Sequence, residues 1–211
     1  MGKQLFIQIQ VALFFKSDFL GMPENASLAI KEQFGNDITT QILGIPANAP
    51  SEIPRVVVTS NIVNINLSKN RIDFFSKNQE FLTTNLDKMF NIIEKISVTI
   101  GRVGIVFTYF KEGEIKEIKS IFDQSKIDNL DPKEITVRFD EKKEIAGIMS
   151  NSSQKYVSGF ANDEVGVKKR GIIITRDINT LQEDINKNSF NKETLNKFII
   201  DSIFEADKIL I

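Results

Sequence analysis

Residues 102–110 read RVGIVFTYF, and the fold follows from the place of this stretch in the 211-residue chain. The segment is apolar and rich in β-branched and aromatic residues, which predicts a buried β-strand. A similar strand opens the chain, because apolar side chains occupy every second position from Leu5 to Phe15. The pattern of the first half therefore starts again at residue 102.

The first half contains one further helix before its long one, and several short strands. Proline and glycine mark the segment ends, and β-branched residues mark the strands. Apolar residues three and four apart predict a long amphipathic helix that ends at Gly101. In chain order we expect a helix at 23–35, a short strand within 37–46, a loop at 47–54, strands at 55–60, 62–67 and 71–75, and a helix at 77–101.

The second half repeats this order of elements. Its final helix has Asn191 as a predicted N-cap, because a side-chain oxygen at that position accepts from the first free backbone amides. After the strand at 102–110 we expect a helix at 114–124, strands at 134–140, 144–150, 155–161 and 170–178, and a helix at 191–211.

Both halves thus run strand, helix, three or four strands and long helix, although their residues show no clear identity. One half alone would bury only a thin core, and no Gly- or Ser-rich linker separates the halves. We therefore expect a single α+β domain over 1–211 with pseudo-duplicated, pseudo-symmetric halves at 1–101 and 102–211. Their strands should form one curved, mainly antiparallel sheet covered by two long helices.

The composition removes several classes of function. The chain has no Cys and no His, so thiol nucleophiles, Ser-His-Asp triads and the usual zinc ligands are absent. Lys and Arg number 27 against 28 Asp and Glu, which is not the basic excess typical of a nucleic-acid binder. No apolar run is long enough for a membrane span, and no signal-peptide cleavage site is evident. We expect a cytoplasmic protein with no catalytic residue set, no metal site and no cofactor.

Three short motifs in about the last half of the chain carry a resemblance. They are RVG at 102–104, DIN at 177–179 and FE at 204–205. They resemble a sporadically distributed bacterial family of uncharacterised proteins that has a mid-chain Arg-Val-Gly strand and a late apolar strand ending in Asp-Ile-Asp or a similar step. The chain departs from the family in continuing with IVFTYF rather than an RYIN-like strand. The resemblance implies architecture and a defence-associated role, and it supplies no activity.

Two polar groups near the last strand are candidate binding residues. Asp177 and Asn179 form a D-x-N pair where we expect that strand to end, which favours a turn over a metal or substrate role. The trio Lys168, Lys169 and Arg170 precedes the strand, which favours a basic loop, with phosphate or nucleic-acid binding as the alternative. We expect no nuclease site at 140–144, because its acids and lysines are typical of a solvated hairpin tip.

A third candidate is the second face of the sheet. Gln8 and Gln10 interrupt the first strand, and Thr108 and Tyr109 do the same on its counterpart, so this face should be of mixed polarity and open to a partner. The many Phe residues are instead expected to fill the core in place of Trp. Those predicted to point inward are Phe6, Phe14, Phe15, Phe74, Phe75, Phe81, Phe90, Phe107 and Phe110.

The preferred hypothesis is a non-enzymatic binding or assembly module that uses the exposed sheet face, with a protein partner or self-association into a homo-oligomer. One alternative is a Mg²⁺-dependent enzyme that acts on phosphate esters through Asp177 or Asp140. A second alternative is a small apolar ligand bound between the sheet and the helices.

Overall fold

The computed structural model describes residues 4–35, 37–113, 136–162 and 167–208. Its strands are β1 (Gln4–Phe15), β2 (Thr39–Ile42), β3 (Val56–Thr59), β4 (Asn64–Leu67), β5 (Arg71–Ser76), β6 (Ile100–Glu112), β7 (Thr136–Ile145), β8 (Ile148–Asn162) and β9 (Lys168–Thr180). These nine strands form one sheet in the order β2-β3-β4-β5-β1-β6-β9-β8-β7. Every neighbouring pair is antiparallel, which confirms the predicted α+β class and its large antiparallel sheet.

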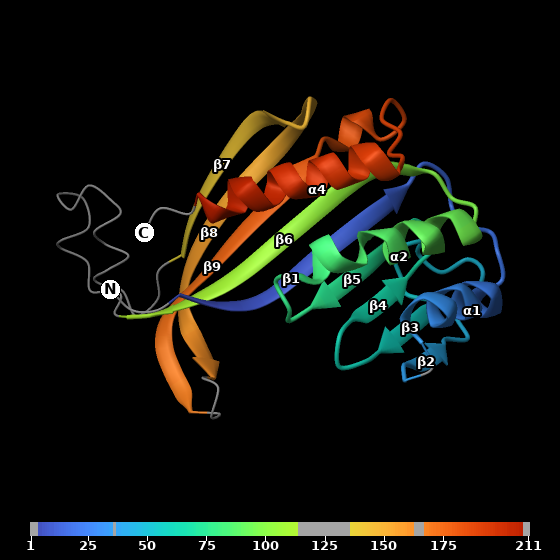
Figure 1. Ribbon diagram of the computed structural model, residues 1–211, viewed down its shortest axis with the longest axis horizontal. Helices are drawn as coiled ribbons and strands as arrows, with labels where there is room; N and C mark the ends of the chain where they lie inside the picture. Colours follow the sequence, from blue (N-terminus) through green and yellow to red (C-terminus); the bar gives the residue numbers. More distant parts are fainter. Residues whose placement is uncertain (1–3, 36, 114–135, 163–166, 209–211) are drawn as a thin grey trace.

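The helices lie together on one face of the sheet (Figure 1). They are α1 (Pro23–Phe34), α2 (Phe81–Lys95) and α4 (Lys192–Asp207), and a short 3₁₀ turn η2 (Gln182–Asp184) precedes α4. Figure 1 shows α4 over the strands of the second half, while α1 and α2 lie over the first half. Three helices of 12, 15 and 16 residues therefore cover the described sheet, rather than the predicted two.

The core lies between this helix layer and the sheet. β1 and β6 occupy neighbouring positions in the middle of the sheet, and their alternate apolar residues point to the helices. Ile9, Val11 and Leu13 on β1 are fully buried, as are Val103 and Ile105 on β6. These side chains belong to one continuous apolar cluster with residues from all three helices.

The strand β1 does not alternate strictly over its whole length. Phe6 pairs with Tyr109 and Gln8 pairs with Thr108, so Ile7 is an extra residue in a β-bulge. The bulge places Phe6 on the helix side, in edge-to-face contact with Tyr109. The prediction that all odd positions from Leu5 to Phe15 share one face was therefore wrong before the bulge and correct after it.

The predicted helix at 77–101 was wrong in its extent, because α2 ends at Lys95 and residues 100 and 101 belong to β6. The chain leaves the helix through Ser97, whose φ of 56° is left-handed. Gly101 serves close packing rather than a helix stop, since a Cβ there would overlap the backbone oxygen of Ile185.

The strand predicted at 144–150 was also wrong. Ala146 and Gly147 have φ values of 54° and 82°, so they form the two-residue turn that joins β7 to β8. The predicted helix at 114–124 lies outside the described residues.

The predicted N-cap of α4 is confirmed. The Asn191 side chain accepts from the Thr194 amide at 2.8 Å, and the Thr194 hydroxyl accepts from the Asn191 amide at 3.0 Å. Beyond this capped end, Leu195 and Ile199 pack into the core. Residues 209–211 of the helix predicted at 191–211 lie outside the described residues.

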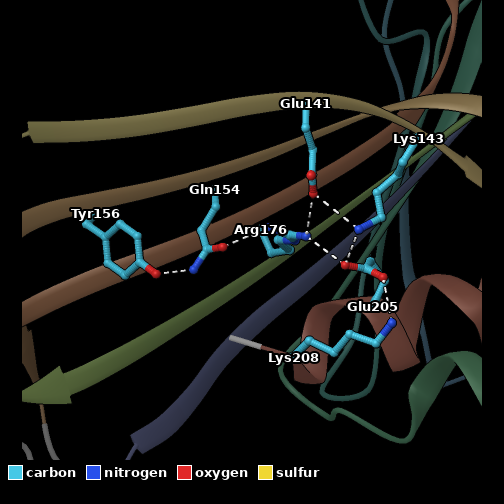
Figure 2. Close-up of polar contacts among 7 residues, drawn as sticks. All are labelled: Glu141, Lys143, Gln154, Tyr156, Arg176, Glu205 and Lys208. Carbon is cyan, nitrogen blue, oxygen red and sulfur yellow. Dashed lines mark hydrogen bonds and ion pairs between the residues drawn. The ribbon is translucent and has the colours of Figure 1, made fainter. Parts of the chain in front are cut away.

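Buried charges hold the other end of α4 on the sheet (Figure 2). Arg176 on β9 donates to Glu205 on α4 at 3.0 Å and to Gln154 on β8 at 2.8 Å. Lys143 on β7 and Lys208 also donate to Glu205, at 2.5 and 3.1 Å. The Arg176 and Glu205 side chains are only 8% and 10% exposed, so the ion pair between them is buried.

Burial alone would raise the pKa of Glu205, but hydrogen bonds from Lys143 and Lys208 outweigh it and hold the pKa below its ordinary value of 4.5. A carboxyl group with a depressed folded pKa stabilises the protein above its unfolded pKa. That stabilisation is lost as the pH falls through the lower, folded value.

We predict that Glu205→Ala lowers the free energy of unfolding by about 3 kcal/mol at pH 7, because the buried Arg176 then loses its nearest carboxylate and keeps only the exposed Glu141 at 3.5 Å. Urea denaturation measures the loss, and Glu193→Ala on the exposed side of α4 is the control, expected to cost under about 1 kcal/mol. The difference between wild type and Glu205→Ala should shrink as the pH falls below the ordinary pKa of 4.5. A loss of stability equal to that of the control would refute the role of Glu205 and Arg176 in stabilising α4 on the sheet.

Candidate functional site

The face of the sheet opposite the helices, called the open face below, carries a polar cluster at its centre. Alternate residues of four adjacent strands point to this face, as the strand register shows. The central members are Gln10 and Phe14 on β1, Arg71 and Asp73 on β5, Arg102 and Gly104 on β6, and Asp177 and Asn179 on β9. β1 and β5 come from the first half of the chain and β6 and β9 from the second, so both halves build the cluster.

Phe14 lies between two arginines in this cluster. Its register partners are Arg71 on one side and Arg102 on the other. The two guanidinium carbons lie 5.5 and 4.4 Å from the centre of the Phe14 ring, which is cation–π distance. Phe14 is half-buried on the open face, so its predicted place in the core was wrong. The same holds for Phe75, two residues beyond Asp73 on β5.

Each arginine is oriented by a different set of acceptors. Arg71 donates from Nε to Asp73 at 2.9 Å, and Gln10 donates to the other oxygen of that carboxylate at 3.3 Å. Burial raises the pKa of Asp73, although Arg71 opposes the shift. Arg102 donates to the Thr180 carbonyl at 3.1 Å and to the Gln182 side chain at 2.6 Å. Burial and the charge of Arg71 lower the pKa of Arg102, and the charge of Asp177 acts in the opposite direction.

Asp177 and Asn179 lie inside β9 rather than at its end, so the predicted turn there was wrong. Asp177 pairs with Val106 and Ser153, and Asn179 pairs with Gly104 and Asn151. Asn179 donates to the Asp177 carboxylate. Burial raises the pKa of Asp177, and the hydrogen bond from Asn179 and the charge of Arg138 only partly oppose the shift.

Gly104 makes room for this arrangement. A Cβ at Gly104 would overlap the side-chain oxygen of Asn179, which leans across β6 towards Arg102. The RVG and DIN motifs, separated by more than 70 residues in the sequence, are therefore neighbours that share one close contact.

A groove of about 400 Å³ runs from this cluster towards the β7 edge of the sheet. Its lining combines both charge signs with amides and a hydroxyl: Arg102, Arg138, Asp140, Glu141, Lys142, Asn151, Ser153, Asp177 and Asn179. Arg138 donates to Asp140 at 2.8 Å across its rim. The groove is polar, which suits a ligand with both hydrogen-bond donors and acceptors.

The remaining predicted site residues lie at two other places. Gln8 and Gln10 are on the open face as predicted, and Gln8 lines a separate hollow of about 230 Å³ beside β4 and β5. Lys168, Lys169 and Arg170 are the first residues of β9, so the predicted loop there was wrong. They pair with Asn162, Ala161 and Phe160 beyond the end of β6, away from the cluster.

Sequence reasoning missed Phe14, Arg71 and Asp73 as candidate site residues. A weak signal existed, because Arg71 and Asp73 alternate with apolar residues on a strand whose other face is buried. Phe14 gave none, since an aromatic residue on a central strand is usually part of the core.

Among the described residues, no group of three or more Asp or Glu side chains is placed to hold a metal ion. Asp140 and Asp177, the carboxylates of the Mg²⁺ alternative, both line the groove and are hydrogen-bonded to Arg138 and Asn179 respectively.

The chain matches no protein-family model and has no significant match among curated proteins. Within the described ranges, no helix is long and apolar enough to cross a membrane.

We predict that Gly104→Ala costs about 1–3 kcal/mol of stability, because the new methyl group displaces Asn179. Gly44→Ala is the matched control and should be nearly neutral, since a Cβ at Gly44 meets nothing within 4 Å. Asn179→Ala removes the overlapping atoms, so Gly104→Ala should cost much less in that background. Urea denaturation of the wild type, Gly104→Ala, Asn179→Ala and the double variant gives the coupling energy between the two positions. A coupling energy near zero would contradict the close contact.

Proposed function

We propose that this protein is a non-enzymatic binding module whose partner is another protein, bound on the open face around Phe14, Arg71 and Arg102. The observation that carries the proposal is the pair of guanidinium groups on either side of one phenylalanine ring. In the described part of the chain, Arg71 donates only through Nε, so its two terminal nitrogens remain as donors for a partner.

A protein partner suits the charge distribution better than a nucleic acid does. Each arginine of the cluster has a carboxylate nearby, Asp73 for Arg71 and Asp177 for Arg102. These carboxylates would repel a phosphate backbone, while the arginines and amides match the acceptors and donors of a polypeptide. The absence of Cys and His from the sequence supports a non-enzymatic role in the cytoplasm.

We also propose that the sheet is built from two similar halves. From the middle, the strands run β1-β5-β4-β3-β2 outwards in one direction and β6-β9-β8-β7 in the other. In each direction the first strand of the half is innermost and the last strand lies beside it. The RVG motif lies on β6, which pairs with β1 of the first half, and the DIN motif lies on β9, the next strand of the second half.

We predict that Arg102→Ala and Arg71→Ala each reduce capture of the partner at least tenfold, because each removes one side of the cluster. Immobilised protein is incubated with an extract of its native host, and the retained proteins are quantified by mass spectrometry. Lys197→Ala, on the solvent side of α4, removes the same charge and should retain the partner fully.

Circular dichroism confirms that each variant is folded before its capture is compared. Equal capture by all variants would refute the open face as the binding surface. Retention that disappears after nuclease treatment would identify a nucleic-acid ligand instead and overturn the protein partner.

A further inference from the structure

The edge strand β7 offers a surface beyond the open-face cluster. In the described part of the chain β7 pairs only with β8, and it is last in the strand order. It is ten residues long, and most of its side chains are exposed. A long exposed strand at the edge of a sheet can pair with another strand unless its side chains prevent it.

Pairing of β7 with a second copy of itself is subject to a strict geometric rule. Only alternate residues of an edge strand turn their N–H and C=O groups outwards, so odd residues must pair with odd ones and even with even. A two-fold axis perpendicular to the sheet satisfies this rule. It also places the helices of both copies on the same face, because the odd residue Lys143 reaches α4 in each.

The charges of β7 select one register under this rule. With Glu141 on the axis, Arg138 lies opposite Glu144 and Asp140 opposite Lys142, each pair occurring twice. A shift of the pairing by one step in one direction places Arg138 opposite Lys142, and a shift in the other direction places Asp140 opposite Glu144. Directly opposed unlike charges contribute about 0.2–1 kcal/mol each, and like charges destabilise. Neither neighbouring register is complementary.

The two Glu141 carboxylates that meet on the axis are each accompanied by nearby cations. In each copy Lys143 donates to Glu141 at 3.2 Å, and Arg176 lies 3.5 Å from the same oxygen. These cations offset the repulsion between the two carboxylates on the axis.

We propose that β7 pairs antiparallel with β7 of a second copy, with Glu141 on the two-fold axis, so that the dimer has one continuous sheet. The groove beside β7 in each copy then meets its counterpart across the axis. This inference does not depend on the proposed partner of the open face, whose test uses Arg71 and Arg102.

Cysteine cross-linking tests the register, because the chain has no Cys of its own. Residues directly opposite each other have Cα atoms about 4.5–5.5 Å apart, within disulfide reach. Glu141→Cys should form a disulfide-linked dimer on oxidation. Asp140→Cys and Lys142→Cys should each stay monomeric in denaturing gels but cross-link when mixed. Absence of the Glu141→Cys dimer, or cross-linking of Asp140→Cys with itself, would overturn the proposal.

Charge reversal tests the association without a cross-link. Arg138→Glu places like charges opposite Glu144 and should weaken the dimer at least tenfold in sedimentation equilibrium, as should Glu144→Arg. An equimolar mixture of the two variants restores both pairs and should return a dimer. Lys197→Glu on α4 is the control and should leave dimerisation unchanged. A wild-type chain that stays monomeric at its highest soluble concentration, or a mixture that does not associate, would contradict self-pairing of β7.

Discussion

The antiparallel pairing of β1 with β6 is the constraint on which the rest of the structure depends. It joins the two halves of the chain along most of the length of both strands. On one face it aligns Ile9, Val11 and Leu13 with the core of β6, and each of these side chains contributes about 1.5–3 kcal/mol by leaving water. On the other face the same register brings Phe14 beside Arg102. The core and the candidate site thus lie on opposite faces of the same strand pair.

Much of the fold could be predicted from the sequence where one side of an element is apolar and the other polar. The strand β1 was found in this way, whereas apolar runs rich in β-branched residues indicated β6 and β9, and the side-chain oxygen of Asn191 indicated the cap of α4. Errors arose where a residue type has two uses. Gly101 suits a helix end and also a close backbone contact, and only the position of Ile185 decides between them.

The candidate site could be predicted only in part, because its members are defined by strand register. Gln10 was identified as a polar residue on a strand, but Asp177 and Asn179 were assigned to a turn at a strand end, since Asp and Asn favour turns. Its neighbours Val106 and Ser153 keep it within the sheet instead. Strand register brings together residues that are far apart in the sequence, and a local pattern in a single sequence does not reveal that register.

The central place of β1 has a consequence for biosynthesis. β1 is synthesised before both of its partners, which begin at residues 71 and 100. At about 5–20 residues per second, its second edge stays unpaired for roughly 5–20 s while the chain lengthens. During that time an apolar strand with at least one free edge is open to association with other nascent chains. Gln8 and Gln10, in the middle of this strand, reduce its apolar character before β6 is synthesised. Assistance from a chaperone would matter most before residue 112, where β6 ends.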